Sequence, residues 1–537
     1  MKNNIYKYLL LMPLVAILAA CTSNDEFLEE KTYGKIFPEN FYRNQDELDM
    51  ANNALYRSFS KTFNADYSSF VVILFGGDDI TTPYSANTSY LQNDTYVRQS
   101  ANKDIRDGWS WAYETINTAN GIINNYQKAA DEVSETNLHY AAAQAHFARA
   151  YMYFWLVRIF NEIPYVSTVR EPDKTMTKSS PQEVYDAIIA DLKIAEEWLP
   201  ATWKGIDETK AAGGGFTQAA AKATLANVYL TMAGYPLKKT EYYKLAKDKA
   251  AEIIENESKY GFRLLDHFAE LWKPTPLIND EMVFGLMYNR STEDYNVRAP
   301  KSCRPVQFGG WEAYCPEINF FYRFPEGERR DATFVTEFPL TNGWYTTAPT
   351  IPWPEGQPML QWQDIMFKHP YYFKMWEAEG LEGADKWKPA GDNDWYSGRT
   401  NQVIRYPEVL LIYAEAQAMA DGTPNALAYD CINRVRNRAF AGVGSTQNNL
   451  PTGLSAEAFR DSVFVERGWE FAGYEYASRW FDLVRLELVE DAASANPKHA
   501  FLPGRSADDW TIASPPTHDS YFMPIPEEDA LLNPNLK

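Results

Sequence analysis

Residues 405–439 read RYPEVLLIYAEAQAMA, DGTP and NALAYDCINRVRNRA, two apolar-rich patterns joined by a four-residue turn. In both patterns apolar residues recur every three or four positions, as they do along the buried face of an α-helix. Gly422 and Pro424 lie in the turn, where they favour the end of one helix and the start of the next. This segment therefore predicts a helical hairpin.

Small residues mark the place where the two helices of the hairpin are expected to cross. Ala416 and Ala428 are 12 positions apart, and Ala246 and Ala250 begin a similar pattern in an earlier segment. Tetratricopeptide repeats use small residues where their paired helices approach closely. The pattern predicts tetratricopeptide-like helical pairs, and a generic helical bundle is the alternative.

Apolar periodicity predicts further helices upstream of the hairpin. They are expected from Asp46 onward, over Trp109–Gln127, over about Tyr140–Phe160, from Ser180-Pro181 to Ala195, and over Thr217–Ala233 paired with Tyr242–Ile254. Ser180 and Pro181 are typical of a helix start, as a capping residue followed by proline in the first turn. We expect four irregular helical pairs.

The helical rhythm is largely lost between residues 260 and 400, where Pro, Gly, Asn and aromatic residues take over. From Cys303 to Trp376, 18 of 74 residues are aromatic, against 15% in the whole chain. Long irregular segments in compact proteins are usually functional. We predict that this segment contributes to binding, although some of its rings must form its own core.

Composition excludes several classes of function. The formal net charge is −21, which argues against nucleic acid as a partner because phosphates require a basic surface. The six histidines and few cysteines are not spaced as metal ligands, and we expect no metal, cofactor or catalytic residue. Asp392-Asn393-Asp394 lacks the rest of a calcium loop and is interpreted as a turn. Cys303 and Cys315 could form a disulfide in an oxidising compartment, whereas Cys431 is expected in the core.

The first residues have the layout of a bacterial export signal. Lys2 and Lys7 precede the apolar run LLLMPLVAILAA (residues 9–20), and Cys21 follows two small residues. The run is shorter than the roughly 20 residues that span a bilayer. Residues 1–20 are therefore predicted to be a removed signal peptide and Cys21 a lipidated residue. An ordinary signal peptide with an incidental cysteine is the alternative.

Several blocks of the chain resemble, in order, signatures of the SusD/RagB family. They are AHFARAYMYFWLVRIFNEIP (145–164), RYPEVLLIYAEAQAMA (405–420), CINRVRNRA (431–439), FVERGWEFAGYEYASRWFDLVR (464–485) and YFMPIPEEDALLNPNL (521–536). The resemblance extends upstream to Trp109–Tyr113 and Asn120–Ile123, so it covers essentially the whole chain after the signal. The family consists of nutrient-uptake lipoproteins of the Bacteroidetes outer membrane.

The resemblance implies an all-α, tetratricopeptide-like (SusD-like) protein anchored by lipid to the outer face of the outer membrane. It would capture oligosaccharide, or in some members peptide, and deliver it to a TonB-dependent (SusC-like) transporter. We accordingly expect a lipidated tether and arm over residues 21–45 and one SusD-like domain over 46–537, with 260–400 as an irregular ligand-binding insertion. A secreted all-helical glycoside hydrolase is a less favoured alternative, because it needs two carboxylates facing one cleft.

The charged residues of the 464–485 block are interpreted as structural. Helical spacing places opposite charges side by side there, which predicts an ion-pair network rather than acid–base catalysis. Its expected members are Glu466, Arg467, Arg479, Asp482 and Arg485, and Glu415 is interpreted in the same way.

Ligand contacts are predicted from composition and loop position alone. Sugar rings pack their C–H faces on Trp and Tyr, while their hydroxyls pair with Asp, Asn or Arg. One loop, residues 76–96, offers Asp78, Asp79, Tyr84, Asn87, Tyr90 and Asn93; the irregular segment offers Trp311, Tyr314, Trp344, Tyr345 and Trp353. For any single aromatic residue, a place in the loop core is the alternative.

Overall fold

Antiparallel α-helices dominate the computed structural model. It describes residues 41–64, 70–82, 88–169, 173–211, 214–273, 278–288, 302–305, 310–339, 359–363, 369–376, 378, 398–441, 446–473, 475–495 and 515–537. Among these residues, no helix is both long and apolar enough to cross a membrane.

The α-helices are distributed along the whole described chain. They are α3 (Gln45–Asn64), α4 (Thr88–Asp94), α5 (Lys103–Asn125), α6 (Glu135–Phe160), α7 (Pro181–Trp198), α8 (Glu208–Ala211), α9 (Gln218–Ala233), α10 (Tyr242–Ile254), α11 (Glu257–Tyr260), α13 (Ile318–Arg323), α14 (Glu328–Thr333), α15 (Tyr406–Asp421), α16 (Ala426–Ala441), α17 (Ala456–Glu470), α18 (Arg479–Arg485), α19 (Val489–Ala495) and α20 (Glu527–Leu532).

Short 3-10 helices and strands complete the structure. The 3-10 helices are η2 (Phe70–Gly76), η3 (Tyr126–Ala129), η4 (Phe268–Trp272), η7 (Phe373–Met375), η10 (His518–Tyr521) and η11 (Pro534–Leu536). The strands are β1 (Ile80–Thr81), β2 (Met282–Leu286), β3 (Cys315–Pro316), β4 (Phe334–Val335), β5 (Glu337–Pro339), β6 (Met359–Gln361), β7 (Tyr371–Tyr372) and β8 (Asn401–Arg405). They form four two-stranded antiparallel sheets, β1–β3, β2–β8, β4–β7 and β5–β6.

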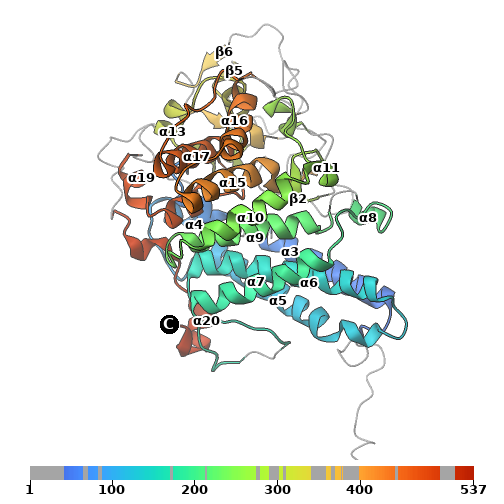
Figure 1. The fold of residues 1–537 in the computed structure, drawn as a ribbon. Coiled ribbons are helices and arrows are strands. Elements are labelled where there is room, and N and C mark those ends of the chain that lie inside the picture. The colour runs from blue at the N-terminus through green and yellow to red at the C-terminus, as the bar shows by residue number, and fades with distance from the viewer. Residues whose placement is uncertain are drawn as a thin grey trace, which may run out of the picture. The chain divides into compact units, whose positions relative to one another are not determined.

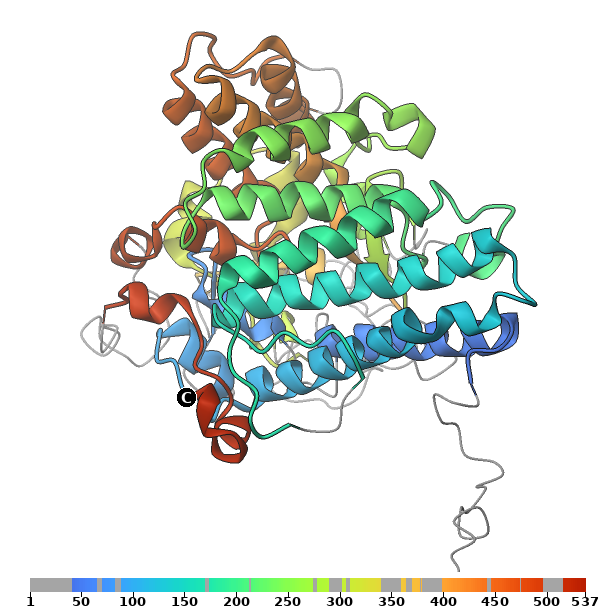
Figure 2. The ribbon, with the colours of Figure 1, turned by 60° about the horizontal axis from the view of Figure 1, so that its bottom comes forward.

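The long helices pack one against the next in chain order. Helix α3 contacts α5, α5 contacts α6, α6 contacts α7, α7 contacts α9, α9 contacts α10, and α10 contacts α15, which also packs on α16 and α17. Figures 1 and 2 show these helices as a stack, from α3 and α5 through the green α9 and α10 to the orange α15–α17. The structure confirms the predicted fold class of tetratricopeptide-like helical pairs.

Helix α6 lies at the centre of this stack. Every residue from 141 to 160 is buried, as expected for a helix that is apolar around its whole circumference. Its buried Arg149 donates to Asp191 of α7 at 2.8 Å and to Asn120 of α5 at 2.7 Å. This polar tie fixes three neighbouring helices to one another, because a buried guanidinium requires such partners.

Helix boundaries differ from the predicted ones where capping residues act. Helix α6 begins at Glu135 rather than near Tyr140, because Ser134 accepts a hydrogen bond from the backbone N–H of Asn137. Likewise Asn102 caps α5, which begins at Lys103 rather than Trp109. Their first turns are too polar for apolar periodicity to reveal, whereas side-chain caps define them.

The start of the C-terminal helical hairpin is also corrected by the structure. Arg405 is the last residue of β8, and the helix starts at Tyr406. The apolar run Phe70–Phe75 forms a fully buried 3-10 helix.

The cysteine thiols at 303, 315 and 431 are free and buried, so the disulfide considered between Cys303 and Cys315 is not formed. The thiol of Cys315 instead points to the carbonyl oxygen of Glu312 at 3.7 Å. Burial raises the pKa of all three thiols above their ordinary value.

The start of α7 provides a test of this account of capping. Ser180 and Glu183 form a complete capping box, each side chain bonding the other's backbone N–H. Ser180→Ala should therefore lower the free energy of unfolding by about 1 kcal/mol, measured by denaturant titration. Ser110→Ala, on an exposed face within α5, is the control and should be neutral or slightly stabilising. Equal effects of the two changes would contradict the capping role.

Candidate ligand-binding surface

The two loops predicted to bind ligand meet in the structure. Strand β1 pairs with β3, with Ile80 opposite Pro316 and Thr81 opposite Cys315. The carbonyl oxygen of Asp79 accepts hydrogen bonds from Glu317 N–H (2.9 Å) and from the hydroxyl of Tyr372 in β7 (2.6 Å). Residues almost 300 positions apart thus form one junction, which we call the β1–β3 junction.

An aromatic cluster forms the base of the β1–β3 junction. The ring of Phe75 in η2 lies 5.2 Å from that of Tyr90 in α4 and 5.0 Å from that of Tyr314. Tyr90 and Tyr314 are themselves 5.6 Å apart, and both are buried. These two predicted ligand contacts therefore lie in the loop core in this structure, and a direct contact with ligand stays a prediction.

The polar candidates of the first loop are also buried and hydrogen-bonded. Asn93 donates to Ser89 O (2.9 Å) and accepts from Arg98. Its neighbour Asp94 accepts from the Thr81 hydroxyl (2.9 Å) and from Thr82 N–H (3.2 Å). Together these bonds hold β1 against α4, so the polar side chains position the loop.

Asp78 and Asp79 are adjacent but electrostatically different. Burial alone would raise the pKa of Asp78, but Arg479, 2.7 Å away, and the more distant Arg323 outweigh it and lower the pKa. Burial, followed by the nearby charge of Asp78, raises the pKa of Asp79 to about 7. The Asp79 carboxylate accepts from Gly473 N–H at 2.7 Å. One carboxylate is thus held ionised by arginine, and the other sits where ionisation is costly.

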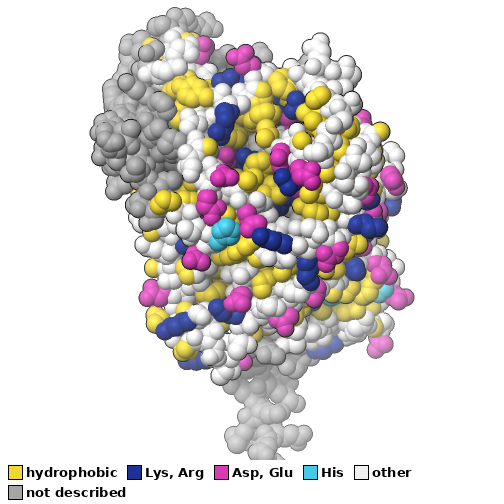
Figure 3. All heavy atoms as spheres, turned by 60° about the vertical axis from the view of Figure 1, so that its left-hand side comes forward, with side chains coloured by type: hydrophobic (Ala, Val, Ile, Leu, Met, Phe, Trp, Pro, Cys, Tyr) yellow, Lys and Arg dark blue, Asp and Glu magenta, His cyan; other side chains and the backbone are white. Residues whose placement is uncertain are grey.

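Exposed side chains come from the segment that starts just before β3 and ends with α13. Trp311 is 37% exposed and Tyr322 is 55% exposed. Arg323, beside Tyr322, has a half-exposed guanidinium arm. We call Trp311, Tyr322 and Arg323 the α13 surface. Figure 3 shows hydrophobic side chains interspersed with both acidic and basic ones over the face of the molecule that carries α13 and α19.

Tyr322 was not among the predicted contacts. It follows the buried Phe320 and Phe321 in INFFYR, and its ring lies 6.2 Å from that of Trp362. The signal was available in the pattern, because a six-residue helix that buries two successive phenylalanines must turn the next side chain outward. Tyr84, Asn87, Trp344, Tyr345, Trp353 and Cys21 lie outside the described residues, as does the Asp392–Asp394 turn.

All five residues of the predicted ion network form ion pairs. Arg467 and Arg485 both bind Asp482, at 2.7 and 2.8 Å. Arg485 also binds Glu415 at 2.7 Å, Glu466 binds Arg329 at 2.7 Å, and Arg479 binds Asp78. The pairs join α17 and α18 to α15, α14 and the β1–β3 junction.

A second buried charge cluster was not anticipated from the sequence. Arg405 contacts Glu470 at 2.7 Å, Glu475 at 2.8 Å and Glu281 at 3.1 Å. Burial alone would raise the pKa of Glu470, but Arg438, Arg405 and Arg329 outweigh it and lower the pKa to about 2. The three glutamates around Arg405 extend from Glu281 to Glu475, 194 positions apart (475 − 281), a pairing that no local spacing reveals. Within the described part of the chain, no cluster of three or more His, Cys, Asp or Glu is placed to hold a metal ion.

Comparison with known proteins identifies relatives along most of the chain. Residues 371–537 match the SusD family, and residues 26–230 match a family described as starch-binding and associating with the outer membrane. The SusD-like protein P2 of Formosa agariphila is 28% identical, with 97% of each chain covered.

Solved structures share the fold. A SusD homologue from Bacteroides thetaiotaomicron superposes with a TM-score of 0.74 at 23% identity, covering 94% of this chain and 98% of that one. A laminarin-binding SusD-like protein superposes with a TM-score of 0.63 at 20% identity, covering 92% and 98%.

The elevated pKa of Asp79 predicts a pH-dependent effect of Asp79→Asn. Between about pH 4 and 7 the folded protein holds a proton on Asp79 that the unfolded chain releases, so stability falls as pH rises through this window. Asparagine stays neutral and still accepts from Gly473. The variant should be more stable than the natural protein by about 2–4 kcal/mol at pH 8, and the gain should shrink as pH falls towards 4.

Urea titrations across pH 4–8 would measure this difference. Asp78→Asn is the matched control and should have the opposite effect. The pKa of Asp78 is lowered in the folded protein, so its ionised carboxylate stabilises the fold at pH values above the pKa of this group in the unfolded chain. The variant should therefore be destabilised at pH 8 and less so in acid. A gain for Asp79→Asn that does not vary with pH would contradict the assignment.

Proposed function

Because this chain belongs to the SusD/RagB family, we propose that it binds oligosaccharide outside the cell and delivers it to a TonB-dependent outer-membrane transporter. The observation that carries the proposal is the exposure of Trp311 and Tyr322 beside a buried, cross-braced junction. Exposed rings of this kind stack on the apolar faces of sugars. The name of a structural neighbour, a laminarin-binding SusD-like protein, supports the same ligand class.

Rigidity at the β1–β3 junction favours a binding role. The rings project from elements held by buried hydrogen bonds, including those of Asp79 and Tyr372, so little order has to be gained on binding. Each stacked ring contributes about 0.5–1.5 kcal/mol beyond its buried area. Two or three rings give modest affinity, which suits a protein that must release its ligand to a partner.

We further propose that the predicted loops supply additional contacts. Tyr84, Asn87, Trp344, Tyr345 and Trp353 belong to the two loops whose described parts meet at the β1–β3 junction. Tyr90 and Tyr314 would contribute indirectly, since both are buried in the aromatic cluster beside the junction. In this scheme residues 260–400 are the ligand-binding insertion of a single SusD-like domain over 46–537.

Lipidation of Cys21 would place the protein at the membrane. After cleavage of residues 1–20, the lipidated cysteine and the tether to residue 45 would hold the domain on the outer face of the outer membrane. Several acyl chains together make a stable anchor, whereas one holds only weakly. The family match described as associating with the outer membrane supports this location.

We propose binding without catalysis. The conspicuous carboxylates of the C-terminal third, Glu466, Glu470 and Asp482, are buried and paired with arginines. A glycoside hydrolase needs two carboxylates that face its substrate about 5–10 Å apart. Peptide binding by the same architecture is the second candidate, and it would depend on backbone hydrogen bonds rather than on exposed rings.

Ligand affinity should depend on the α13 surface. Calorimetry with a panel of oligosaccharides and peptides should identify an oligosaccharide ligand. Trp311→Ala and Tyr322→Ala should each weaken its binding about 2- to 13-fold, the equivalent of one stacked ring.

Trp111→Ala is the matched control. This half-buried tryptophan of α5 contacts Lys61 on the helical scaffold, and its loss should leave affinity unchanged. Binding of peptides but no sugars, or unchanged sugar affinity in both α13-surface variants, would contradict the proposal; turnover of a bound oligosaccharide would favour the hydrolase.

The anchor makes a separate prediction. Cys21→Ala removes the acylated sulfur, so the protein should move from the membrane fraction to the soluble fraction, as judged by immunoblotting of fractionated cells. Ligand binding by the released protein should be unchanged. Continued fractionation of the variant with the outer membrane would contradict lipidation at Cys21.

A further inference from the structure

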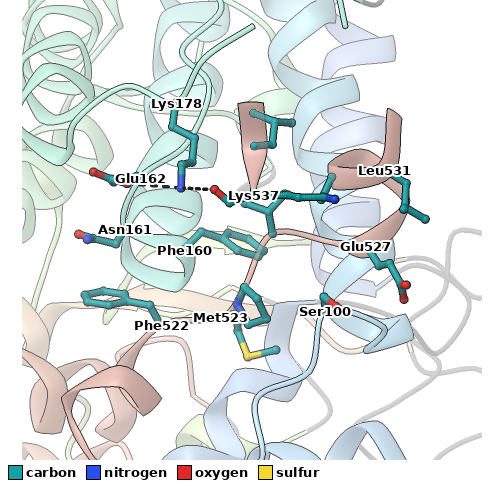
Figure 4. A pocket seen from close by; sticks show the side chains of 14 residues that line it. Ser100, Phe160, Asn161, Glu162, Lys178, Phe522, Met523, Glu527, Leu531 and Lys537 are labelled. Carbon is teal, nitrogen blue, oxygen red and sulfur yellow. Dashed lines mark hydrogen bonds and ion pairs between the residues drawn. The ribbon is translucent and has the colours of Figure 1, made fainter. Parts of the chain in front are cut away.

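A cavity of about 480 Å³ lies between the C-terminal end of α6 and residues 522–537 (Figure 4). Apolar and polar groups both line it, and of the apolar ones Phe160 and Met523 are buried and Phe522 is half-buried. Lys178 and Glu162 line its polar side, 3.5 Å apart. Proteins commonly bind small ligands in cavities of about 300–1,000 Å³ with a few polar groups among apolar ones.

A narrow crevice adjoins this cavity. Asn161 and Phe522 line both spaces, and Figure 4 shows them close together at the end of the cavity away from Leu531 and Glu527. The crevice has a volume of about 10 Å³, room for about one water-sized group. Arg158 lines it, with its guanidinium between the rings of Phe154 (3.7 Å) and Phe481 (3.9 Å).

The charge of Arg158 is buried without a close counter-charge. Only 8% of the residue is exposed, and its Nε donates to the carbonyl oxygen of Phe154 at 3.0 Å. Across the described part of the chain, that is the only hydrogen bond of the guanidinium, and no carboxylate forms an ion pair with it. Burial lowers its pKa to about 10, so the group is still charged at neutral pH, and Glu408 and Asp482 attract it only from a distance. A buried charge in this state favours an anionic partner.

Asn161 presents a complementary group at the same place. Its backbone is strained, with φ 67° and ψ −75°, in a turn closed by a hydrogen bond from Glu162 N–H to Phe160 O (2.9 Å). Its side-chain Oδ1 is buried and accepts no hydrogen bond from any described residue. Positive φ in a residue other than glycine is costly and is often found at functional sites. A ligand hydroxyl would satisfy this acceptor.

The geometry points to a second binding site, separate from the α13 surface, that takes an acidic sugar such as a uronate. The carboxylate would accept hydrogen bonds from the terminal amino groups of Arg158, and a ring hydroxyl would donate to Asn161 Oδ1. The apolar face of the sugar would lie against Phe522, whose own ring is braced by Tyr235 at 6.1 Å. A uronate combines carboxylate, hydroxyls and an apolar face on one ring, which matches the donor, acceptor and aromatic groups present. The site does not depend on the function proposed for the α13 surface.

The test compares two ligands that differ only in the group at C6 of the sugar. Methyl glucuronide carries a carboxylate where methyl glucoside carries a hydroxymethyl group. Titrated into the purified protein, the glucuronide should bind at least about tenfold more tightly, as expected for a charge-assisted hydrogen bond. Arg158→Gln should remove this preference. Equal affinity for the two ligands in the natural protein would overturn the proposal.

Asn161→Gly tests the site without threatening the fold. Glycine adopts positive φ without strain, so the melting temperature should be unchanged or higher, whereas loss of Oδ1 should weaken glucuronide binding about three- to tenfold. This variant decides the question if Arg158→Gln does not fold. The doubly substituted Trp311→Ala, Tyr322→Ala protein should retain glucuronide binding. If the doubly substituted protein loses glucuronide binding while Asn161→Gly binds normally, the uronate binds at the α13 surface, and the proposed second site is overturned.

Discussion

Arg405 is the side chain on which the arrangement of the C-terminal half depends. It is fully buried and contacts three glutamates from two separate parts of the chain: Glu281 before β2, and Glu470 and Glu475 at the end of α17 and just after it. Arg438 shares two of these carboxylates. The cluster fixes the β2–β8 pair, the start of α15 and the end of α17 relative to one another. Removal of one charged residue would leave the charges of the others buried and unpaired, so such a cluster permits few alternative packings.

The same principle extends outward to the β1–β3 junction. Lys374 beside β7 reaches Glu475, and Arg479 of α18 reaches Asp78. Segments with little regular structure are thereby tied to the helical stack by charge rather than by long strands or helices. The exposed Trp311 and Tyr322 thus stand on a framework fixed by buried contacts, and preorganisation of this kind would reduce the entropy lost if they bind a ligand.

The helical pairs could be predicted from the sequence, but the long-range pairing of the buried charges could not. Apolar spacing identified α9, α10, α15 and α16, because burial of one face leaves a local signal. It missed the first turns of α5 and α6, where polar caps rather than apolar residues set the boundary. Asp78 was predicted to face ligand, yet its partner Arg479 lies 401 positions away, and no local pattern encodes that pairing. The exposure of Tyr322 could have been predicted, because the two phenylalanines that precede it in α13 are buried.

The buried thiols bear on where this protein can work. Cys303, Cys315 and Cys431 are unpaired, enclosed and kept in the protonated form by burial, and thiols react chiefly as thiolates. Maturation of the domain therefore requires no oxidant and no disulfide-exchange catalyst. A molecule built this way keeps the same shape whether its surroundings are anoxic or aerated.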